Sequence, residues 1–287
     1  MPAVRVAVVG SANLDLVARA ARIPNPGETV MGSAYSEYHG GKGANQAVGA
    51  ARTAPTAFVG CVGTDEAGRR TLGHLEQRGV VTDELAVVEG ETGRAVITVA
   101  DDGENSIVVL PLANLAVSPD QVRQSLDRLQ PEAVLCQLEI PIESVVEAAA
   151  WCERNKKRFL LNPSPVAEVP EHVVALADPL LVNRGEAVAL ARGPEGQPLR
   201  DALEALRGRA RSLVGTDGAR GTLISEADGS FAEVPVTPTK AADTTGAGDE
   251  FAGTLAAALA SGASLRDAAV AASRAASALI AIDRDKR

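Results

Sequence analysis

Apolar runs and helical repeats alternate along most of this chain. Mainly apolar runs that predict strands are residues 4–9, 57–61, 133–137, 158–162, 179–182, 211–215 and 221–225. Helical spacing of apolar residues is found at 41–52, 65–78, 119–129, 141–156, 184–192 and 198–208, and two alanine-rich helices close the sequence. This alternation predicts an α/β fold of the Rossmann-like kind, with a mostly parallel central sheet and helices on both faces.

Four further segments have the pattern of exposed or half-exposed strands and interrupt the alternation. These segments are residues 14–20, 28–38, 95–100 and 106–110. The turn at 24–27 separates the first two, and a polar turn at 101–104 makes a hairpin of the others. We predict that about 14–39 and 91–111 form one small β-sheet lid on a single domain of residues 1–287.

Composition narrows the class of protein. A chain of 287 residues with 46% hydrophobic and 23% charged residues is an ordinary globular composition. The net charge of −9 and the 2% aromatic content argue against a nucleic-acid partner, which requires basic surface and stacking side chains. We therefore expect small-molecule ligands and no nucleic acid.

The compartment is predicted from cysteines and from the chain's two ends. Cys61, Cys136 and Cys152 lie in or beside apolar runs and lack metal-ligand spacing, as in a reducing cytoplasm. The first residues lead directly into a strand pattern without the layout of a signal peptide. Charged residues such as Arg266 and Arg274 interrupt the alanine-rich end, so we expect a cytoplasmic protein with no membrane partner.

Polar residues follow several predicted strands at their carboxyl ends, where open α/β sheets bind ligands. Asn13 and Asp15 follow the first strand and could grip vicinal hydroxyls, although on their own a turn capped by Asn and Asp is the simpler interpretation. Glu139 follows residues 133–137, and here an exposed loop carboxylate is an equal alternative.

Glycines surround Lys42 at the start of a predicted helix. Gly40, Gly41 and Gly43 weaken a helix but let the backbone approach a ligand closely. The segment is neither a Walker loop nor a dinucleotide fingerprint, because GxxxxGK[ST] and GxGxxG are both missing. A glycine turn with a solvated lysine remains the alternative.

Two weaker signals lie in the second half of the chain. Asn183 and Glu186 share one face of a helix start and could hold a Mg²⁺-bound water, but the spacing alone favours a helix cap. Residues 216–221 form a glycine turn between strands, which could pass beneath a nucleotide or be an ordinary hairpin turn.

The segment 243–251 carries the most specific chemistry. A polar turn with Gly246 and Gly248 runs into an alanine-rich helix, which directs backbone N–H groups and the positive end of the helix dipole at one point. That geometry predicts an anion site. Asp249 places a carboxylate there, as a base that must deprotonate a hydroxyl beside a phosphoryl group requires.

The order of these motifs resembles the ribokinase-like (PfkB) carbohydrate kinases over essentially the whole chain. The signatures are Gly40–Gly43 with the following Ala44-Asn45-Gln46-Ala47, and Asp243-Thr244-Thr245-Gly246-Ala247-Gly248-Asp249. The segments 24–29, 45–46 and 162–165 are similar to the branch that acts on ribose. The resemblance implies ATP-dependent phosphorylation of the primary hydroxyl of a pentose, with D-ribose expected, and homodimers paired through the lid.

The resemblance also implies roles for individual residues. Substrate would be bound by Asn13, Asp15, Gly41, Lys42, Asn45, Glu139 and Asp249, and ATP by Asn183, Thr216, Gly218, Gly221 and Gly248. Gly246, Ala247 and Gly248 would form the anion hole, with Asp249 as general base. Glu186 would act on Mg²⁺ through water, and Asp243 and Thr245 would hold a monovalent cation, K⁺.

Four departures from the family pattern bear on these roles, and one of them is that Arg184 and Gly185 replace commoner residues between Asn183 and Glu186. Glu250 follows the base where a small or hydroxyl residue is usual, and an inward carboxylate there would raise the pKa of Asp249. Leu112 replaces a usual glycine beside the sugar pocket. The resemblance further implies a loop and helix beyond Arg287 that would complete the cation site.

Two other functions stay open at this point, one in the same class and one in a different class. A related kinase could act on deoxyribose, a ketose or a nucleoside, although few aromatics near the sugar motifs disfavour a nucleoside base. A non-catalytic relative that binds sugar or nucleotide is the second alternative, motivated by Glu250.

Overall fold

The computed structural model describes residues 3–225 and 229–286. Its strands are β1 (Val6–Val9), β2 (Asn13–Ala20), β3 (Gly32–Gly40), β4 (Thr56–Gly63), β5 (Leu85–Val88), β6 (Gly93–Ala100), β7 (Asn105–Leu110), β8 (Ala133–Cys136), β9 (Arg158–Leu161), β10 (Ala177–Asn183), β11 (Leu213–Thr216), β12 (Thr222–Ser225) and β13 (Phe231–Val234). Its α-helices are α1 (Lys42–Ala51), α2 (Glu66–Gln77), α3 (Pro119–Leu129), α4 (Ile142–Asn155), α5 (Glu171–Leu176), α6 (Arg184–Leu190), α7 (Leu199–Leu206), α8 (Ala247–Ala260) and α9 (Leu265–Ile280). Short 3₁₀ turns are η1 (Leu112–Ala116), η2 (Gly218–Arg220) and η3 (Arg284–Lys286).

The central sheet has nine strands in the order β13-β12-β11-β10-β9-β8-β1-β4-β5. Neighbouring strands pair in parallel from β11 to β5, whereas β11 with β12 and β12 with β13 pair antiparallel. Along β1, Val6 and Val8 belong to one apolar cluster, while Ala7 and Val9 belong to the other. Successive side chains of a strand point to opposite faces, so a strand covered on both faces is apolar throughout. The predicted fold class is confirmed.

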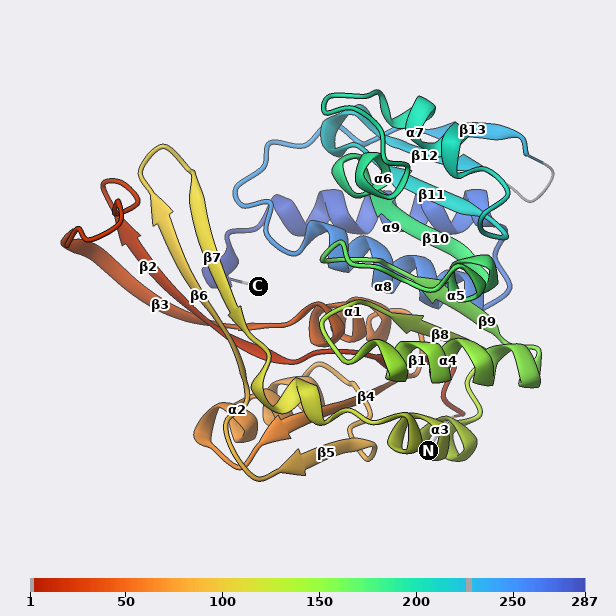
Figure 1. Cartoon of the computed structure of the whole chain (residues 1–287), viewed down its shortest axis with the longest axis horizontal. Helices are drawn as coiled ribbons and strands as arrows, with labels where there is room; N and C mark the ends of the chain where they lie inside the picture. The colour runs from red at the N-terminus through yellow and green to blue at the C-terminus, as the bar shows by residue number, and fades with distance from the viewer. Residues whose placement is uncertain (1–2, 226–228, 287) are drawn as a thin grey trace.

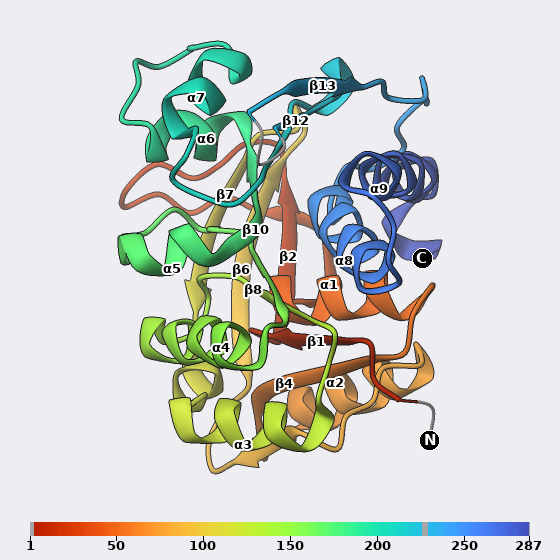
Figure 2. The same cartoon turned by 90° about the vertical axis from the view of Figure 1, so that its right-hand side faces the viewer.

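Helices cover the two faces of this sheet in separate groups. In Figure 2, α1, α8 and α9 lie on one side of the strands, whereas α3, α4, α6 and α7 lie on the other. The first group packs mainly through alanine and glycine, which allows its helices to approach one another closely. That close approach shapes the site described below.

A second, four-stranded sheet with the order β3-β2-β6-β7 projects from the body of the molecule (Figure 1). Its outer pairs are antiparallel and its central pair, β2 with β6, is parallel. Because β2 starts four residues after β1 ends, this sheet rises from the carboxyl edge of the central sheet. We call it the lid sheet, and its closing role stays a prediction.

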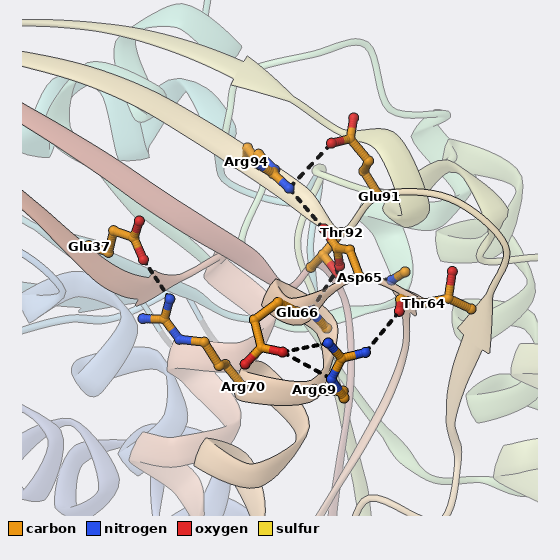
Figure 3. A network of polar contacts seen from close by, with 11 residues as sticks. Glu37, Thr64, Asp65, Glu66, Arg69, Arg70, Glu91, Thr92 and Arg94 are labelled. Atoms are coloured by element: carbon orange, nitrogen blue, oxygen red, sulfur yellow. Dashed lines mark hydrogen bonds and ion pairs between the residues drawn. The ribbon is translucent and has the colours of Figure 1, made fainter.

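A polar network joins the lid sheet to α2 (Figure 3). Asp65 caps α2 by accepting from the Gly68 amide at 3.0 Å, and it also accepts from Thr92 Oγ1 at 2.6 Å and Arg94 Nη2 at 2.8 Å. A second ion pair joins Arg70 of α2 to a glutamate of β3 at 2.5 Å. The root of the lid sheet is therefore fixed to the central domain by charged hydrogen bonds.

The structure departs from the expected elements in a few places. The predicted strand 28–38 begins only at Gly32, because Glu28 accepts hydrogen bonds from Arg22 and Asn25 and belongs to the preceding loop. The short elements β5, α5 and β13 were not predicted. Among the described residues, no helix combines the length and apolar character needed to cross a membrane.

Candidate functional site

Helix α8 begins in the glycine turn singled out in the sequence. Gly246 has a φ of 77°, the left-handed conformation that glycine adopts without strain, and the helix starts at the next residue. Asp249 lies in the first turn of α8, where the helix dipole favours negative charge. The sequence therefore places backbone N–H groups and a carboxylate at one helix start.

Close packing of α1 against α8 brings the two sequence signatures together. A Cβ atom on Gly253 would lie 2.2 Å from the carbonyl oxygen of Gln46, and one on Gly49 would lie 3.2 Å from the Cα of Glu250. Side chains at these positions would push the helices apart. The glycines thus allow the amides of α1 to reach Asp249.

Two amides of α1 donate hydrogen bonds to Asp249. Asn45 Nδ2 lies 3.2 Å from Oδ2, and Gln46 Nε2 lies 3.0 Å from Oδ1. Gln46 also donates to Asn162 Oδ1 at 3.1 Å and accepts from Gln137 Nε2 at 2.6 Å. These links fix the orientation of the carboxylate within a network that joins α1 to the residues directly after β9 and β8.

The pKa of Asp249 is raised to about 6, chiefly because burial disfavours the charged carboxylate. The charge of Lys42 and the hydrogen bonds from Gln46 and Asn45 act in the opposite direction, and the negative charge of Glu139 adds to the rise. A carboxylate with a pKa near 6 is ionised at neutral pH yet is a stronger base than an exposed aspartate.

Glu139 connects the first strand to the glycine–lysine segment. Its Oε2 accepts from Ser11 Oγ at 2.5 Å and from the Lys42 amide at 3.0 Å. Gly41 has a φ of 85°, and a Cβ there would lie 2.8 Å from the Ala12 Cα. Only glycine fits at this close approach.

The first two polar positions are both largely buried. Asn13 Oδ1 accepts from Asn114 Nδ2 at 2.7 Å, and Asn114 Oδ1 accepts from the Ala12 amide at 2.9 Å. Asp15 pairs with Arg284 Nη2 at 2.7 Å. Burial raises the pKa of Asp15, and the neighbouring Arg284 opposes that rise.

A cavity of about 180 Å³ lies between the helix starts and the strand ends. Its lining includes the predicted site residues Lys42, Asn183, Glu186, Thr216, Gly246, Ala247, Gly248 and Asp249. Asn45 and Glu139 reach this group through Asp249 and Lys42. Gly218 and Gly221 are not part of the lining and lie in the turn between β11 and β12.

Asn183 and Glu186 form the helix cap that their spacing favoured. Asn183 Oδ1 accepts from the Glu186 amide at 2.9 Å, and Glu186 Oε2 accepts from the Asn183 amide at 2.8 Å. A capping box commits one oxygen of each side chain. The remaining Asn183 amide and Glu186 oxygen belong to side chains on the cavity wall.

The predicted cation residues lie just before α8. The Thr245 amide donates to Asp243 Oδ1 at 2.7 Å, and the amides of Ala242 and Asp243 both donate to the Ile280 carbonyl. The end of α9 thus supports this loop from behind. Within the described residues, no group of three or more His, Cys, Asp or Glu side chains is arranged to hold a metal ion.

Glu250 and Leu112, which depart from the family pattern, each make a defined local contribution to the structure. Glu250 pairs with Arg52 at 3.2 Å and lines a neighbouring cavity. The largest cause of the raised Asp249 pKa is burial. Leu112 has a φ of 47° and takes the left-handed conformation that glycine would otherwise supply.

Several residues of this constellation had no assigned role in the sequence. Gln46 stood in a quoted motif, and its neighbour Asn45 at a helix start was the available signal. Asn114, Gln137 and Arg284 gave no signal, because their contacts join residues 101, 91 and 269 positions apart.

Comparison with known proteins shows a match to the model described as pfkB family carbohydrate kinase, over residues 4–281. The chain is 38% identical over 275 residues to the ribokinase of Bacillus subtilis (strain 168), covering 95% of this chain and 91% of that protein. It is 36% identical over 259 residues to the bifunctional ribokinase/ribose-5-phosphate isomerase A of Fructilactobacillus sanfranciscensis. That match covers 88% of this chain and 48% of the relative, so the chain spans about half of the bifunctional protein.

A solved structure is similar over nearly the whole chain. Arabidopsis thaliana ribokinase complexed with ribose and ATP superposes with a TM-score of 0.87 at 28% identity, covering 99% of this chain and 97% of that one. The likeness therefore includes the lid sheet as well as the central sheet.

Proposed function

This chain belongs to the pfkB family of carbohydrate kinases, and from that membership we propose that it phosphorylates D-ribose with ATP to give D-ribose 5-phosphate. The observation that carries the proposal is Asp249: a carboxylate with a pKa raised to about 6, at a helix start, held by Asn45 and Gln46. Similarity to ribokinases and to a ribose and ATP complex supports the choice of substrates.

In the proposed reaction, Asp249 accepts the proton of the primary hydroxyl as that oxygen attacks the γ-phosphorus of ATP. The backbone N–H groups of Gly246, Ala247 and Gly248 would donate to the phosphoryl oxygens, whose negative charge they stabilise. Lys42 lines the same cavity and adds positive charge beside Asp249. Phosphoryl transfer depends mainly on such alignment and charge neutralisation.

Sugar hydroxyls would be bound by the residues on the lid side of Asp249. We assign Asn13, Asp15, Gly41, Lys42, Asn45 and Glu139 to this role. The hydrogen bonds among these residues and their neighbours support the assignment, because a preordered site loses less entropy when the sugar binds.

Nucleotide would be bound on the other side of the cavity by Asn183, Thr216, Gly218, Gly221 and Gly248. Glu186 would hold Mg²⁺ through water, and the ion would neutralise charge on the phosphates. A single carboxylate fits this group, because Mg²⁺ in kinases usually keeps several waters and binds substrate phosphates. We also propose K⁺ at Asp243 and Thr245; equal rates in potassium and in a bulky organic cation would contradict that site.

The lid sheet would pair with a second copy of the chain to form a homodimer. Its outer strand carries exposed apolar side chains, with Ile107, Val108 and Val109 exposed by 52%, 57% and 44%. Light scattering during gel filtration tests this, and a monomer at micromolar concentration would contradict it. We propose a cytoplasmic location, in keeping with the three free, buried thiols.

The proposed activity is tested by release of ADP over a panel of sugars and nucleosides. We expect the highest kcat/KM with D-ribose, because the site presents amides and carboxylates rather than the aromatic surface that a nucleoside base needs. A preference for 2-deoxyribose, a ketose or a nucleoside would replace the substrate but retain the enzyme class. Measurable ribose or ATP binding without turnover of any sugar would contradict the kinase itself.

A further inference from the structure

The turn η3, which follows α9, reaches back to the lid sheet (Figure 1). Arg284 Nη2 donates to Asp15 Oδ2 at 2.7 Å, and its guanidinium lies over the Tyr38 ring at 4.1 Å from the ring centre. The next residue, Asp285, accepts from the Tyr38 hydroxyl at 2.5 Å. One short turn therefore contacts both β2 and β3, more than 240 residues away along the chain.

The Arg284–Asp15 pair is enclosed rather than superficial. The two side chains are 16% and 13% exposed, whereas the Arg220–Asp217 pair beside the nucleotide turn has an arginine that is 64% exposed. Stacking of the planar guanidinium on an aromatic ring adds a second attraction. In the ligand-free protein, the Asp15 carboxylate therefore stays hydrogen-bonded to Arg284 until another donor displaces the guanidinium.

Occupation of Asp15 conflicts with its proposed binding of the sugar. Arg284 donates to Oδ2 of Asp15. Oδ1 packs against Gly40, so closely that a Cβ atom built on Gly40 would lie 2.0 Å from it. Sugar hydroxyls that donate to Asp15 must therefore compete with the guanidinium. Nothing in the family match predicts this contact, because the matched residues end at 281.

We propose that η3 is a strap that covers the sugar side of the site and that ribose displaces Arg284 from Asp15 when it binds. This inference rests on the proposed sugar site. The contact stabilises the ligand-free protein by pairing a buried carboxylate with a positive charge, and in the complex sugar hydroxyls would donate hydrogen bonds to that carboxylate instead.

Opening of the strap would leave the root of the turn in place. Its root is fixed, because the Ile280 carbonyl accepts from the Ala242 and Asp243 amides in the loop before α8. Beyond that point, residues 281–283, 285 and 286 are exposed, and only Arg284 is partly buried. Opening therefore requires the pair with Asp15 and the contacts with Tyr38 to break, while α9 stays packed.

The first test compares ribose affinity in Arg284→Gln and Lys286→Gln. Both remove one positive charge from the same turn, but Lys286 is exposed. If only a fraction of the ligand-free protein has Asp15 free to bind ribose, the apparent affinity for ribose is reduced by that fraction. Removing Arg284 should therefore lower the KM and Kd for ribose about three- to tenfold. The kcat should change less than twofold, and Lys286→Gln should match the wild type.

Unchanged ribose affinity in Arg284→Gln would overturn the strap, and weaker affinity would overturn it in favour of Arg284 as a direct sugar ligand. Tyr38→Phe keeps the ring but loses the hydrogen bond to Asp285, so it should lower the KM by a smaller factor. A single cooperative melting transition checks that each variant folds; Arg284→Gln should melt below the wild type, because it leaves the buried Asp15 unpaired, whereas Lys286→Gln should melt with the wild type.

A second test follows the strap directly, by hydrogen exchange of the backbone amides of residues 281–286 in the full chain. Ribose should speed their exchange in the wild type but not in Arg284→Gln, where exchange is fast from the start. Ribose-induced protection would overturn the proposal. A wild type that neither binds nor phosphorylates ribose would instead overturn the proposed function, whereas normal turnover with an unresponsive turn would overturn the strap alone.

Discussion

The proposed sugar side and the proposed nucleotide side of the site are built in different ways. On the sugar side, buried side chains hold one another: Asn13 binds Asn114, and Asp15 binds Arg284. On the nucleotide side, the exposed or half-buried lining residues Asn183, Glu186 and Thr216 belong to a helix cap and to the end of a strand. The comparison teaches that the geometry of the proposed sugar side depends on which side chains are present, whereas the geometry of the proposed nucleotide side depends mainly on the conformation of the backbone.

The largest effect is expected where the two sides meet. Asp249→Asn removes the proposed base but keeps the size of the side chain, so kcat should fall by about 10³-fold, within the range of general-base catalysis. Calorimetry should find ribose affinity within threefold of the wild type. Retained turnover would show that Asp249 is not the base.

A change in helix packing should be the next largest. Gly253→Ala places a Cβ 2.2 Å from the Gln46 carbonyl oxygen, so α1 and α8 must separate. Such overpacking costs about 1–3 kcal/mol, and we expect a lower melting temperature and a kcat reduced about tenfold.

The matched control is Gly73→Ala in α2, where an added Cβ meets no atom within 4 Å. Alanine at an unhindered helical site should stabilise the protein by about 0.5–1 kcal/mol and leave turnover unchanged. Equal behaviour of the two variants would refute the close-packing argument.

The pH dependence tests the side-chain network around the base. Since a proposed base must be ionised and the pKa of Asp249 is raised to about 6, kcat/KM should decline below roughly pH 6, tenfold for each further pH unit. Gln46→Leu removes a hydrogen bond that lowers this pKa, so the acid limb should move to higher pH.

Gln137→Leu is the control for that shift, because Gln137 donates to Gln46 and not to Asp249. We expect a smaller displacement of the acid limb in this variant. If the acid limb of the pH–rate profile does not move in Gln46→Leu, that limb does not report the ionisation of Asp249.

The smallest effect is expected on the nucleotide side. Glutamine can replace Glu186 in the capping box but carries no charge, so Glu186→Gln should retain stability and raise the Mg²⁺ concentration for half-maximal rate about threefold. Glu186→Ala should also lose about 1 kcal/mol of stability, as the cap is removed. An unchanged Mg²⁺ requirement in Glu186→Gln would reduce Glu186 to a cap.

Much of the fold followed from the sequence, since strands covered on both faces leave a clear apolar signal. The elements that escaped prediction are short: β5 and β13 have four residues each, and α5 has six. Pairing with neighbours, rather than local pattern, defines such elements. The predicted strand at 28–38 was too long because the Glu28 side chain accepts hydrogen bonds from Arg22 and from the Asn25 amide, which keep it in the preceding loop.

The site was predictable to the extent that function lies in contiguous motifs. Both signatures were found, and the structure brings them within hydrogen-bonding distance through Asn45 and Asp249. Asn114 and Arg284 could not be found, because each acts through a partner distant in sequence and neither stands in a recognisable motif. The choice between cap and metal role for Glu186 also needs more than spacing.

The contact between α1 and α8 has a consequence for how this protein can change. Gly49 and Gly253 allow the two helices to lie so close that Asn45 donates a hydrogen bond to Asp249 between them. The distance between the proposed base and its amide partners is thus set by helix packing, before any sugar arrives. A descendant could acquire another sugar by altering Asp15, Tyr38 or the turn at Arg284, and it would keep its catalytic alignment intact.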